Sequence, residues 1–194
     1  MGNTTDLASP DRIKVSVALF THTTPEDFFK STGKRLEDVD NGSSNVSRQE
    51  LEESFKNAKY ANFSSGQKEM LVLVTKSANH GIILPEVQTL NRQQTTLELF
   101  NSESQLFPTG PQISVLPTIE GEKIKFTAIG KVREKRDSSE QPSEAQVQEF
   151  ITGDFVASGS VKNGEQCYIF LDGVPDKYGN VGKASLILTL TKAD

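Results

Sequence analysis

The chain has one cysteine, no tryptophan and two histidines among its 194 residues, and it lacks a long uninterrupted apolar run. A single cysteine excludes an internal disulfide. Because Cys167 lies in the apolar run Gln166–Leu171, we expect a small buried side chain rather than a reactive thiol. A transmembrane helix needs about 20 consecutive apolar residues. The sequence therefore predicts a protein that does not span a membrane by itself.

The charge of the chain is weakly acidic, with a formal net charge of -5 and a pI near 5.2. A nucleic-acid-binding surface needs concentrated positive charge, so we expect no nucleic-acid partner. The one basic segment, residues 131–136, runs directly into the acidic, serine-rich segment 137–144. We interpret the basic segment as the solvated flank of a hairpin rather than as a binding patch, and residues 133–149 as a polar loop.

The first ten residues are polar and lack the apolar core of a secretory signal. We expect residues 1–11 to form a flexible N-terminus and residues 12–194 to form a single domain. Neither of the two candidate boundaries, 38–46 and 133–149, has the length or composition of a linker. We expect a cytoplasmic protein unless a leader was removed.

Two capping patterns predict helices in the first third of the chain. Residues 24–27 place a threonine before a proline and two carboxylates, which is a typical helix start. Residues 47–50, Ser-Arg-Gln-Glu, fit the capping box, in which the serine and glutamate side chains satisfy backbone donors of the first turn. Apolar residues follow at helical spacing, so we predict a helix over 48–60 that packs on a sheet.

Most of the remaining chain has the period of two that is typical of strands. The clearest case is residues 13–19, where four apolar residues alternate with Lys14, Ser16 and Ala18. Asn163-Gly164 predicts a hairpin, because both positions tolerate positive φ. We expect another strand to stop at Pro117, which has no N–H to donate. Further strands are predicted over 70–75, 82–84, 95–100, 113–116, 123–129, 150–161, 167–171 and 184–191.

These elements predict a β-rich α+β fold: a mainly antiparallel curved sheet, or a small β-sandwich, with one or two helices packed on it. The segment 38–46 is expected to be an exposed loop, and the glycine-rich segment 172–182 a loop that connects two strands.

The sequence contains no pattern that indicates catalysis. His22 and His80 have no partner at metal-ligand spacing. Asp172, Asp176 and Asn180 are spaced faintly like a calcium loop, but the terminal glutamate is absent, so we expect ordinary turn chemistry. No Gly-x-Ser-x-Gly motif occurs, and the lone cysteine has no evident base. We therefore expect no catalytic, cofactor-binding or metal-binding residues, and a protein that is not an enzyme.

Four segments, taken in order, resemble the secretin homology domain, the shared core of the ring-forming outer-membrane channels of bacterial secretion and pilus systems. They are Leu84–Thr95, Gly110–Ile119, Val161–Gly173 and Ala184–Lys192. The resemblance implies a non-catalytic structural or assembly module of the bacterial cell envelope that binds copies of itself or other envelope proteins. Edge strands that pair between protomers would provide the mechanism.

Two departures from the family pattern are visible. Arg92 replaces a glycine of the first motif, and the chain lacks the aromatic girdles that flank the lipid-facing strands of a membrane barrel. We accordingly predict a soluble, divergent secretin-like domain.

Two other functions remain open from the residues alone. The first is a β-sandwich module that binds glycan or peptide through loops 38–46 and 172–182, with Tyr178 as the aromatic contact. The second is a hydrolase, which would need a cleft that gathers His22 or His80 with carboxylates.

Overall fold

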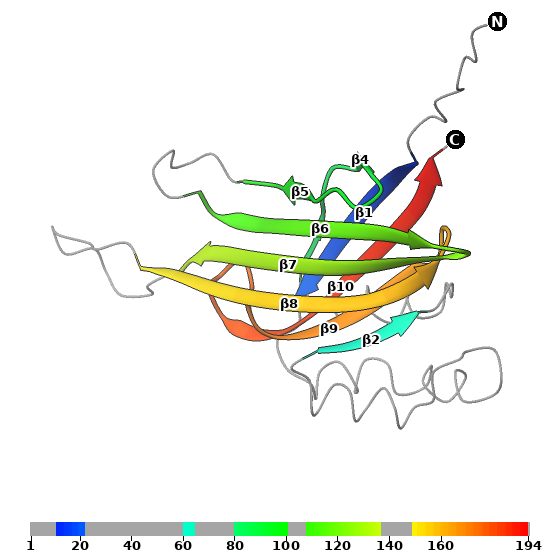
Figure 1. Ribbon diagram of the computed structural model, residues 1–194. Helices are drawn as coiled ribbons and strands as arrows, with labels where there is room; N and C mark the ends of the chain where they lie inside the picture. Colours follow the sequence, from blue (N-terminus) through cyan, green and yellow to red (C-terminus); the bar gives the residue numbers. More distant parts are fainter. Residues whose placement is uncertain (1–10, 22–59, 65–79, 101–107, 137–148, 194) are drawn as a thin grey trace, which may run out of the picture.

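The computed structural model describes residues 11–21, 60–64, 80–100, 108–136 and 149–193. Within these residues the chain forms ten strands in two sheets (Figure 1). The strands are β1 (Arg12–Thr21), β2 (Tyr60–Ser64), β3 (His80–Ile83), β4 (Val87–Leu90), β5 (Thr95–Glu98), β6 (Gly110–Glu120), β7 (Lys123–Lys135), β8 (Phe150–Lys162), β9 (Gln166–Pro175) and β10 (Val181–Ala193).

Sheet A contains six strands, in the order β2-β9-β10-β1-β3, with β4 also paired to β1. β1 pairs with β10 along its full length, from Arg12 opposite Ala193 to Thr21 opposite Ala184. On its other side β1 pairs first with β4 and then with β3. Pro85 lies between those two short strands, where its missing N–H interrupts no ladder. The strand predicted over 13–19 is thus an inner strand of this sheet, paired on both sides.

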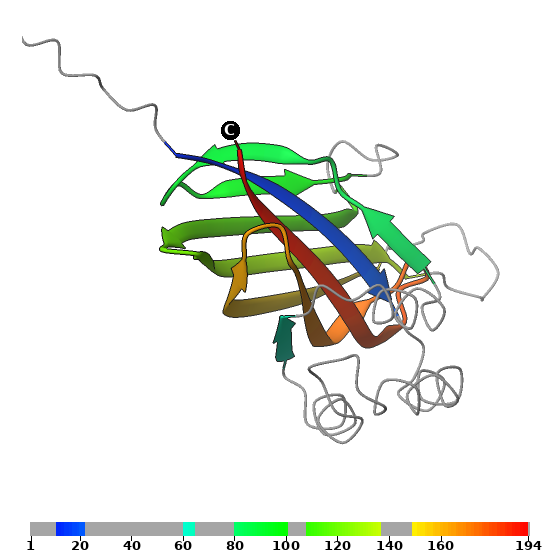
Figure 2. The same ribbon diagram turned by 90° about the vertical axis from the view of Figure 1, so that its right-hand side faces the viewer.

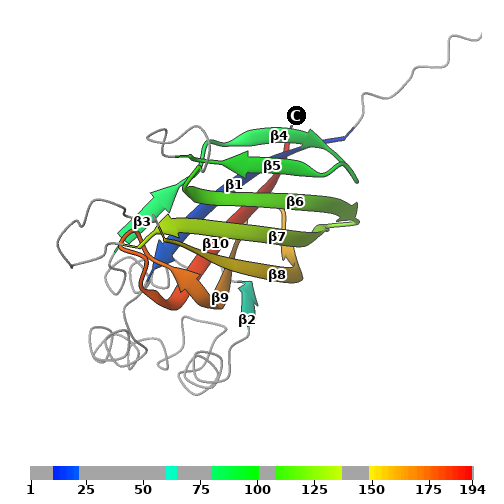
Figure 3. The ribbon, with the colours of Figure 1, turned by 90° about the vertical axis from the view of Figure 1, so that its left-hand side faces the viewer.

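Sheet B contains four antiparallel strands in the order β5-β6-β7-β8. β7 and β8 pair without a register shift from Lys123 opposite Lys162 to Lys135 opposite Phe150. Figure 3 shows these strands in front of β1 and β10, and Figure 2 shows β1 and β10 crossing them steeply from the other side. The described part of the chain therefore follows the sandwich alternative of the predicted fold, with two facing sheets.

The hydrophobic core lies between the two sheets. β1 contributes alternate residues, as the period of two predicted, and each is at most 2% exposed. Sheet B contributes the inward-facing residues of β6, β7 and β8. Full burial of each aliphatic side chain contributes about 1.5–3 kcal/mol relative to exposure. Among the fully buried aliphatic residues of this core are Ile13, Leu19, Leu97, Ile113, Ile169 and Leu188.

Sheet A is also buried on the face that points away from this core, along β9 and β10. Tyr168, Phe170 and Ser185 are fully buried there, and Ile187 is 4% exposed. These residues alternate with core residues and pair across the two strands, Tyr168 with Ile187 and Phe170 with Ser185. Burial on both faces explains why these two strands have nearly continuous apolar sequences.

A glycine lies beneath an aromatic ring in each sheet. Gly130 on β7 is paired with Phe155 on β8, and a Cβ at Gly130 would fall 1.9 Å from the ring. Gly81 on β3 is paired with Phe20 on β1, and a Cβ at Gly81 would fall 2.6 Å from the Phe20 ring. In both pairs the ring occupies the space that a side chain would fill, so only glycine fits opposite it.

Two predicted strand ends differ from the structure. β6 does not stop at Pro117 but continues to Glu120. The carbonyl oxygen of Pro117 accepts the N–H of Arg92, so the backbone of Pro117 faces away from β7. A proline costs no ladder hydrogen bond in that orientation. Likewise, residues 133–135 belong to β7 and residues 150–162 to β8, so only part of 133–149 is a connection between strands.

The predicted Asn163-Gly164 hairpin is wrong in its pairing. The turn is present, because Glu165 donates its N–H to the carbonyl of Lys162 and Gly164 has φ 78. Positive φ at the third turn position alone makes this a type II turn, which splays its flanking strands. β8 accordingly stays in sheet B while β9 enters sheet A.

Several predictions fall outside the described residues. These are the helix start at 24–27, the loop 38–46, the strand at 70–75, and the helix over 48–60 except for Tyr60, which begins β2. The described residues contain no helix.

Candidate functional site: the outer face and edges of sheet B

The outer face of sheet B is open, in contrast to the buried outer face of β9 and β10. Alternation along β7 directs Ile124, Phe126 and Ala128 into the core and leaves Lys125, Thr127 and Ile129 outside. Ile129 pairs with Val156 of β8, and both side chains are 52% exposed. The face is slightly hollowed at two places, one around Leu116, Thr127 and Ser158 and one around Ile129, Lys131 and Val156.

One lateral edge of sheet B is long and regular. Among the described strands, β8 pairs only with β7. The N–H of Arg136 donates to the carbonyl of Glu149, so these two residues form a hydrogen-bonded pair. From there, hydrogen-bonded and non-hydrogen-bonded pairs alternate along β7 and β8. By that alternation the backbone groups of Phe155 and Ala157 face β7, and those of Asp154 and Val156 face outward. β8 has no proline, no bulge and no inward-pointing charge, the usual protections of an edge strand.

The opposite edge of sheet B is closed. β5 covers only the first half of β6, as far as Thr95 opposite Val115. Beyond it, the Asn91-Arg92 turn takes over, because Arg92 N–H bonds to Pro117 O and Asn91 Oδ1 accepts the N–H of Ile119. A short strand, a proline and a capping turn together leave this edge few free backbone groups.

Arg92 has a φ of 65, the only positive value among the described non-glycine residues. It occupies the third position of a turn closed by Gln93 N–H and Leu90 O. This is the position at which the resembled family motif has a glycine. An arginine thus occupies a backbone conformation that favours glycine, at a cost of about 1–2 kcal/mol.

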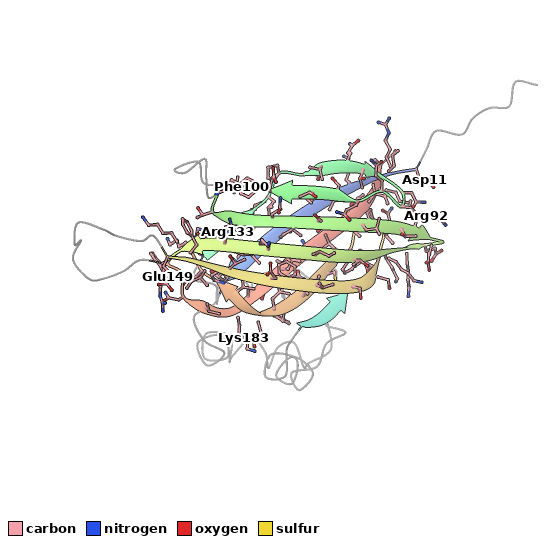
Figure 4. The ribbon with its side chains drawn as sticks, turned by 60° about the vertical axis from the view of Figure 1, so that its left-hand side comes forward. Asp11, Arg92, Phe100, Arg133, Glu149 and Lys183 are labelled. Atoms are coloured by element: carbon pink, nitrogen blue, oxygen red, sulfur yellow. The ribbon has the colours of Figure 1, made fainter. Side chains whose placement is uncertain are left out.

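The other end of sheet B lies against the β9–β10 loop, where a Cβ added at Gly179 would fall 2.9 Å from Arg136 Cα. Figure 4 shows Arg133 and Glu149 at this end, far from Arg92 and Asp11. Glu134 is the last side chain in the row that β7 directs toward the core. Burial, and secondarily the charge of Asp176, raises the pKa of Glu134 to about 7. Asp176 is 5% exposed, and its Oδ1 accepts the N–H groups of Tyr178 and Asn180 at 2.9 Å.

The predicted candidate residues are thus placed as follows. Asp176 holds a turn, as predicted, and Asn180 belongs to that turn. Asp172 accepts from the N–H of Gly173 and from Lys183 Nζ at a bulge. Tyr178 is 51% exposed, with Lys177 Nζ 4.8 Å from its ring centre. Burial raises the pKa of Cys167 to about 12, which agrees with an inert thiol.

The described residues offer little for catalysis. His80 is half-buried at the start of β3, and its carbonyl accepts from Thr21 Oγ1. His22 lies outside the described part of the chain. No group of three His, Cys, Asp or Glu side chains in the described residues could hold a metal ion. No described helix has the length and apolar character that crossing a bilayer would require.

No protein-family model matches the chain, and no curated protein matches it. Solved structures do. The chain is similar to secretins. It matches a chain of the Klebsiella pneumoniae type II secretion system outer membrane complex (PulD, PulS and the PulC HR domain) with a TM-score of 0.43 and 16% identity, covering 95% of this chain and 40% of that one.

Two further matches are the InvG secretin domain β-barrel of the Salmonella SPI-1 injectisome and the Vibrio cholerae type IV competence pilus secretin PilQ. InvG matches with a TM-score of 0.35 and 8% identity, covering 95% of this chain and 60% of that one. PilQ matches with a TM-score of 0.36 and 11% identity, covering 94% and 57%. The chain spans less than two thirds of each of these matched chains. InvG and PilQ are secretins, the family that the sequence motifs resemble.

Proposed function

We propose that the chain is a non-catalytic, secretin-like assembly module of the bacterial cell envelope, and that it associates with copies of itself through the β8 edge of sheet B. The observation that carries the proposal is the outward-facing backbone of Asp154 and Val156 on β8, a strand that pairs only with β7 among the described strands, opposite the closed β5–β6 edge. An exposed strand offers a row of backbone donors and acceptors that a strand of a second copy can satisfy.

The four sequence segments that resemble secretins support this function by their positions. Leu84–Thr95 contains β4 and the Asn91-Arg92 turn that closes one edge, and Gly110–Ile119 forms most of β6. Val161–Gly173 contains the turn that sends β8 and β9 into different sheets, and Ala184–Lys192 lies in β10. The four motifs thus contain strands and turns that determine how the chain is divided between the two sheets.

We also propose that residues 12–194 form one domain in the periplasm or cell envelope. The pairing of Arg12 with Ala193 supports the single domain, because the first and last strands are neighbours in one sheet. After limited proteolysis, the fragments that contain β1 and β10 should remain associated in one protease-resistant complex. Their separation into independent fragments would contradict the proposal.

Sedimentation velocity across a range of protein concentrations tests the assembly function. Val156 faces its N–H outward, so Val156→Pro should remove one edge donor without breaking the β7–β8 ladder. Val156→Thr keeps both the N–H and the branched shape, and is the matched control. We expect the wild-type protein and Val156→Thr to associate as concentration rises, and Val156→Pro to remain monomeric. A wild-type protein that is monomeric at every concentration would overturn the proposed function.

A further inference from the structure

The outer face of sheet B has a charge opposite to that of the whole protein. It gathers six cationic side chains, five from β7 and one from β8, against three anionic ones from β5, β6 and β8. The whole chain has a net charge of -5. The cationic residues are Lys123, Lys125, Lys131, Arg133, Lys135 and Lys162, and the anionic residues are Glu98, Glu120 and Asp154.

Only part of this positive charge is balanced within the described residues. Lys125 pairs with Glu120 at 2.6 Å, and Lys131 lies 3.9 Å from Asp154. Lys123 lies directly opposite Lys162, with no ion pair to either among the described side chains. Like charges opposite one another on adjacent strands are destabilising. An external anion would remove that repulsion.

Apolar side chains lie between the two cationic ends of the face. Ile129 and Val156 form an exposed cross-strand pair, and Leu116 on the neighbouring β6 is 38% exposed. The cations extend from Lys123 to Lys135, about 40 Å at about 3.3 Å per residue. A partner must therefore offer diffuse negative charge over that length together with an apolar layer near its centre.

We infer that the outer face of sheet B docks peripherally on an anionic lipid surface. Such a surface supplies continuous negative charge for the cations and an acyl region for Ile129 and Val156. No membrane-spanning segment is required, and the inference does not depend on self-association. Residues 131–135, at the end of β7, supply only part of the positive charge of this face, which also includes Lys123 and Lys162.

Co-sedimentation of the full chain with lipid vesicles tests the inference. We expect binding to vesicles that contain phosphatidylglycerol, little binding to pure phosphatidylcholine, and weaker binding at high salt. Lys123→Gln with Lys162→Gln should weaken binding about fivefold for each lysine. Arg12→Gln with Lys177→Gln removes the same charge from exposed positions elsewhere and should have a much smaller effect.

The apolar contribution has its own control. Ile129→Ser with Val156→Ser should reduce the binding that persists at high salt, whereas Val181→Ser, at a residue 56% exposed on β10, should not. Equal losses in the β7–β8 variants and their controls would overturn the inference. So would binding to poly-glutamate without binding to anionic vesicles, since the partner would then be an acidic polypeptide.

Discussion

The two sheets differ in what lies outside them. Along β9 and β10, sheet A is buried on both faces, and its outward residues Tyr168, Phe170 and Ile187 are as inaccessible as the core. Sheet B is buried on one face only and exposes Ile129, Val156 and a row of lysines on the other. The difference indicates that sheet A buries more side-chain area than sheet B, and that sheet B has the more accessible outer face.

The largest expected effect comes from an isoleucine on the outer face of each sheet. Ile187→Ala in sheet A removes a side chain that is 4% exposed and should lower the free energy of unfolding by about 2–5 kcal/mol. Ile129→Ala in sheet B removes one that is 52% exposed and should change it by no more than about 0.5 kcal/mol. Urea denaturation measures both, and equal losses would contradict the contrast between the sheets.

A somewhat smaller effect is expected where an aromatic ring covers a glycine in sheet B. Gly130→Ala would place a methyl group against the Phe155 ring and should destabilise the protein by about 1–3 kcal/mol. The double variant Gly130→Ala with Phe155→Leu should recover part of that loss, because the ring that clashes is gone. A double-mutant cycle by thermal denaturation tests this, and strictly additive losses would show that the ring does not determine the glycine.

The free energy of unfolding should depend on pH because of Glu134, which lies where sheet B meets the β9–β10 loop. Burial raises the folded pKa of Glu134 to about 7, above the ordinary value of 4.5 for a glutamate, so the folded state favours the protonated carboxyl. The associated stability is fully present below about pH 4.5 and is lost as pH rises through about 7. Glu134→Gln should be more stable than wild type at pH 8 and match it near pH 4. Parallel pH profiles for the two proteins would contradict the raised pKa.

The smallest expected effect is at the closed edge of sheet B. Arg92→Gly should relieve the strain of positive φ, but glycine also raises the conformational entropy of the unfolded chain. The free energy of unfolding should therefore rise by at most about 1 kcal/mol. Arg92→Val should be destabilising, because a β-branched residue is least tolerant of that conformation. Chemical denaturation of both variants would decide the matter, and a more stable Arg92→Val would exclude strain at this turn.

Much of the strand content followed from the period of two, because half-buried strands must alternate. That rule found β1 and β8 within about two residues at each end, and it found the start of β7 but not its end. It placed the end of β6 wrongly because the cost of Pro117 depends on which way its N–H points, and only the ladder register determines that. The placement of β8 and β9 in different sheets was missed because Asn163-Gly164 permits more than one turn type.

The candidate surfaces were harder to predict than the strands. Lys123 and Lys162 are far apart in the sequence and become neighbours only through the register of β7 and β8. The openness of the β8 edge depends equally on sheet order, which local patterns do not specify. Edge-strand pairing was expected from the secretin resemblance, but the residues alone did not indicate which edge would be unprotected.

Amide hydrogen exchange along β8 at low and high protein concentration tests the proposed assembly most directly. The N–H groups of Phe155 and Ala157 bond to β7 and should be protected at every concentration. Those of Asp154 and Val156 face outward and should exchange quickly when dilute, then slow more than about tenfold as copies associate. Outward amides that exchange at the same rate at every concentration would contradict pairing through this edge.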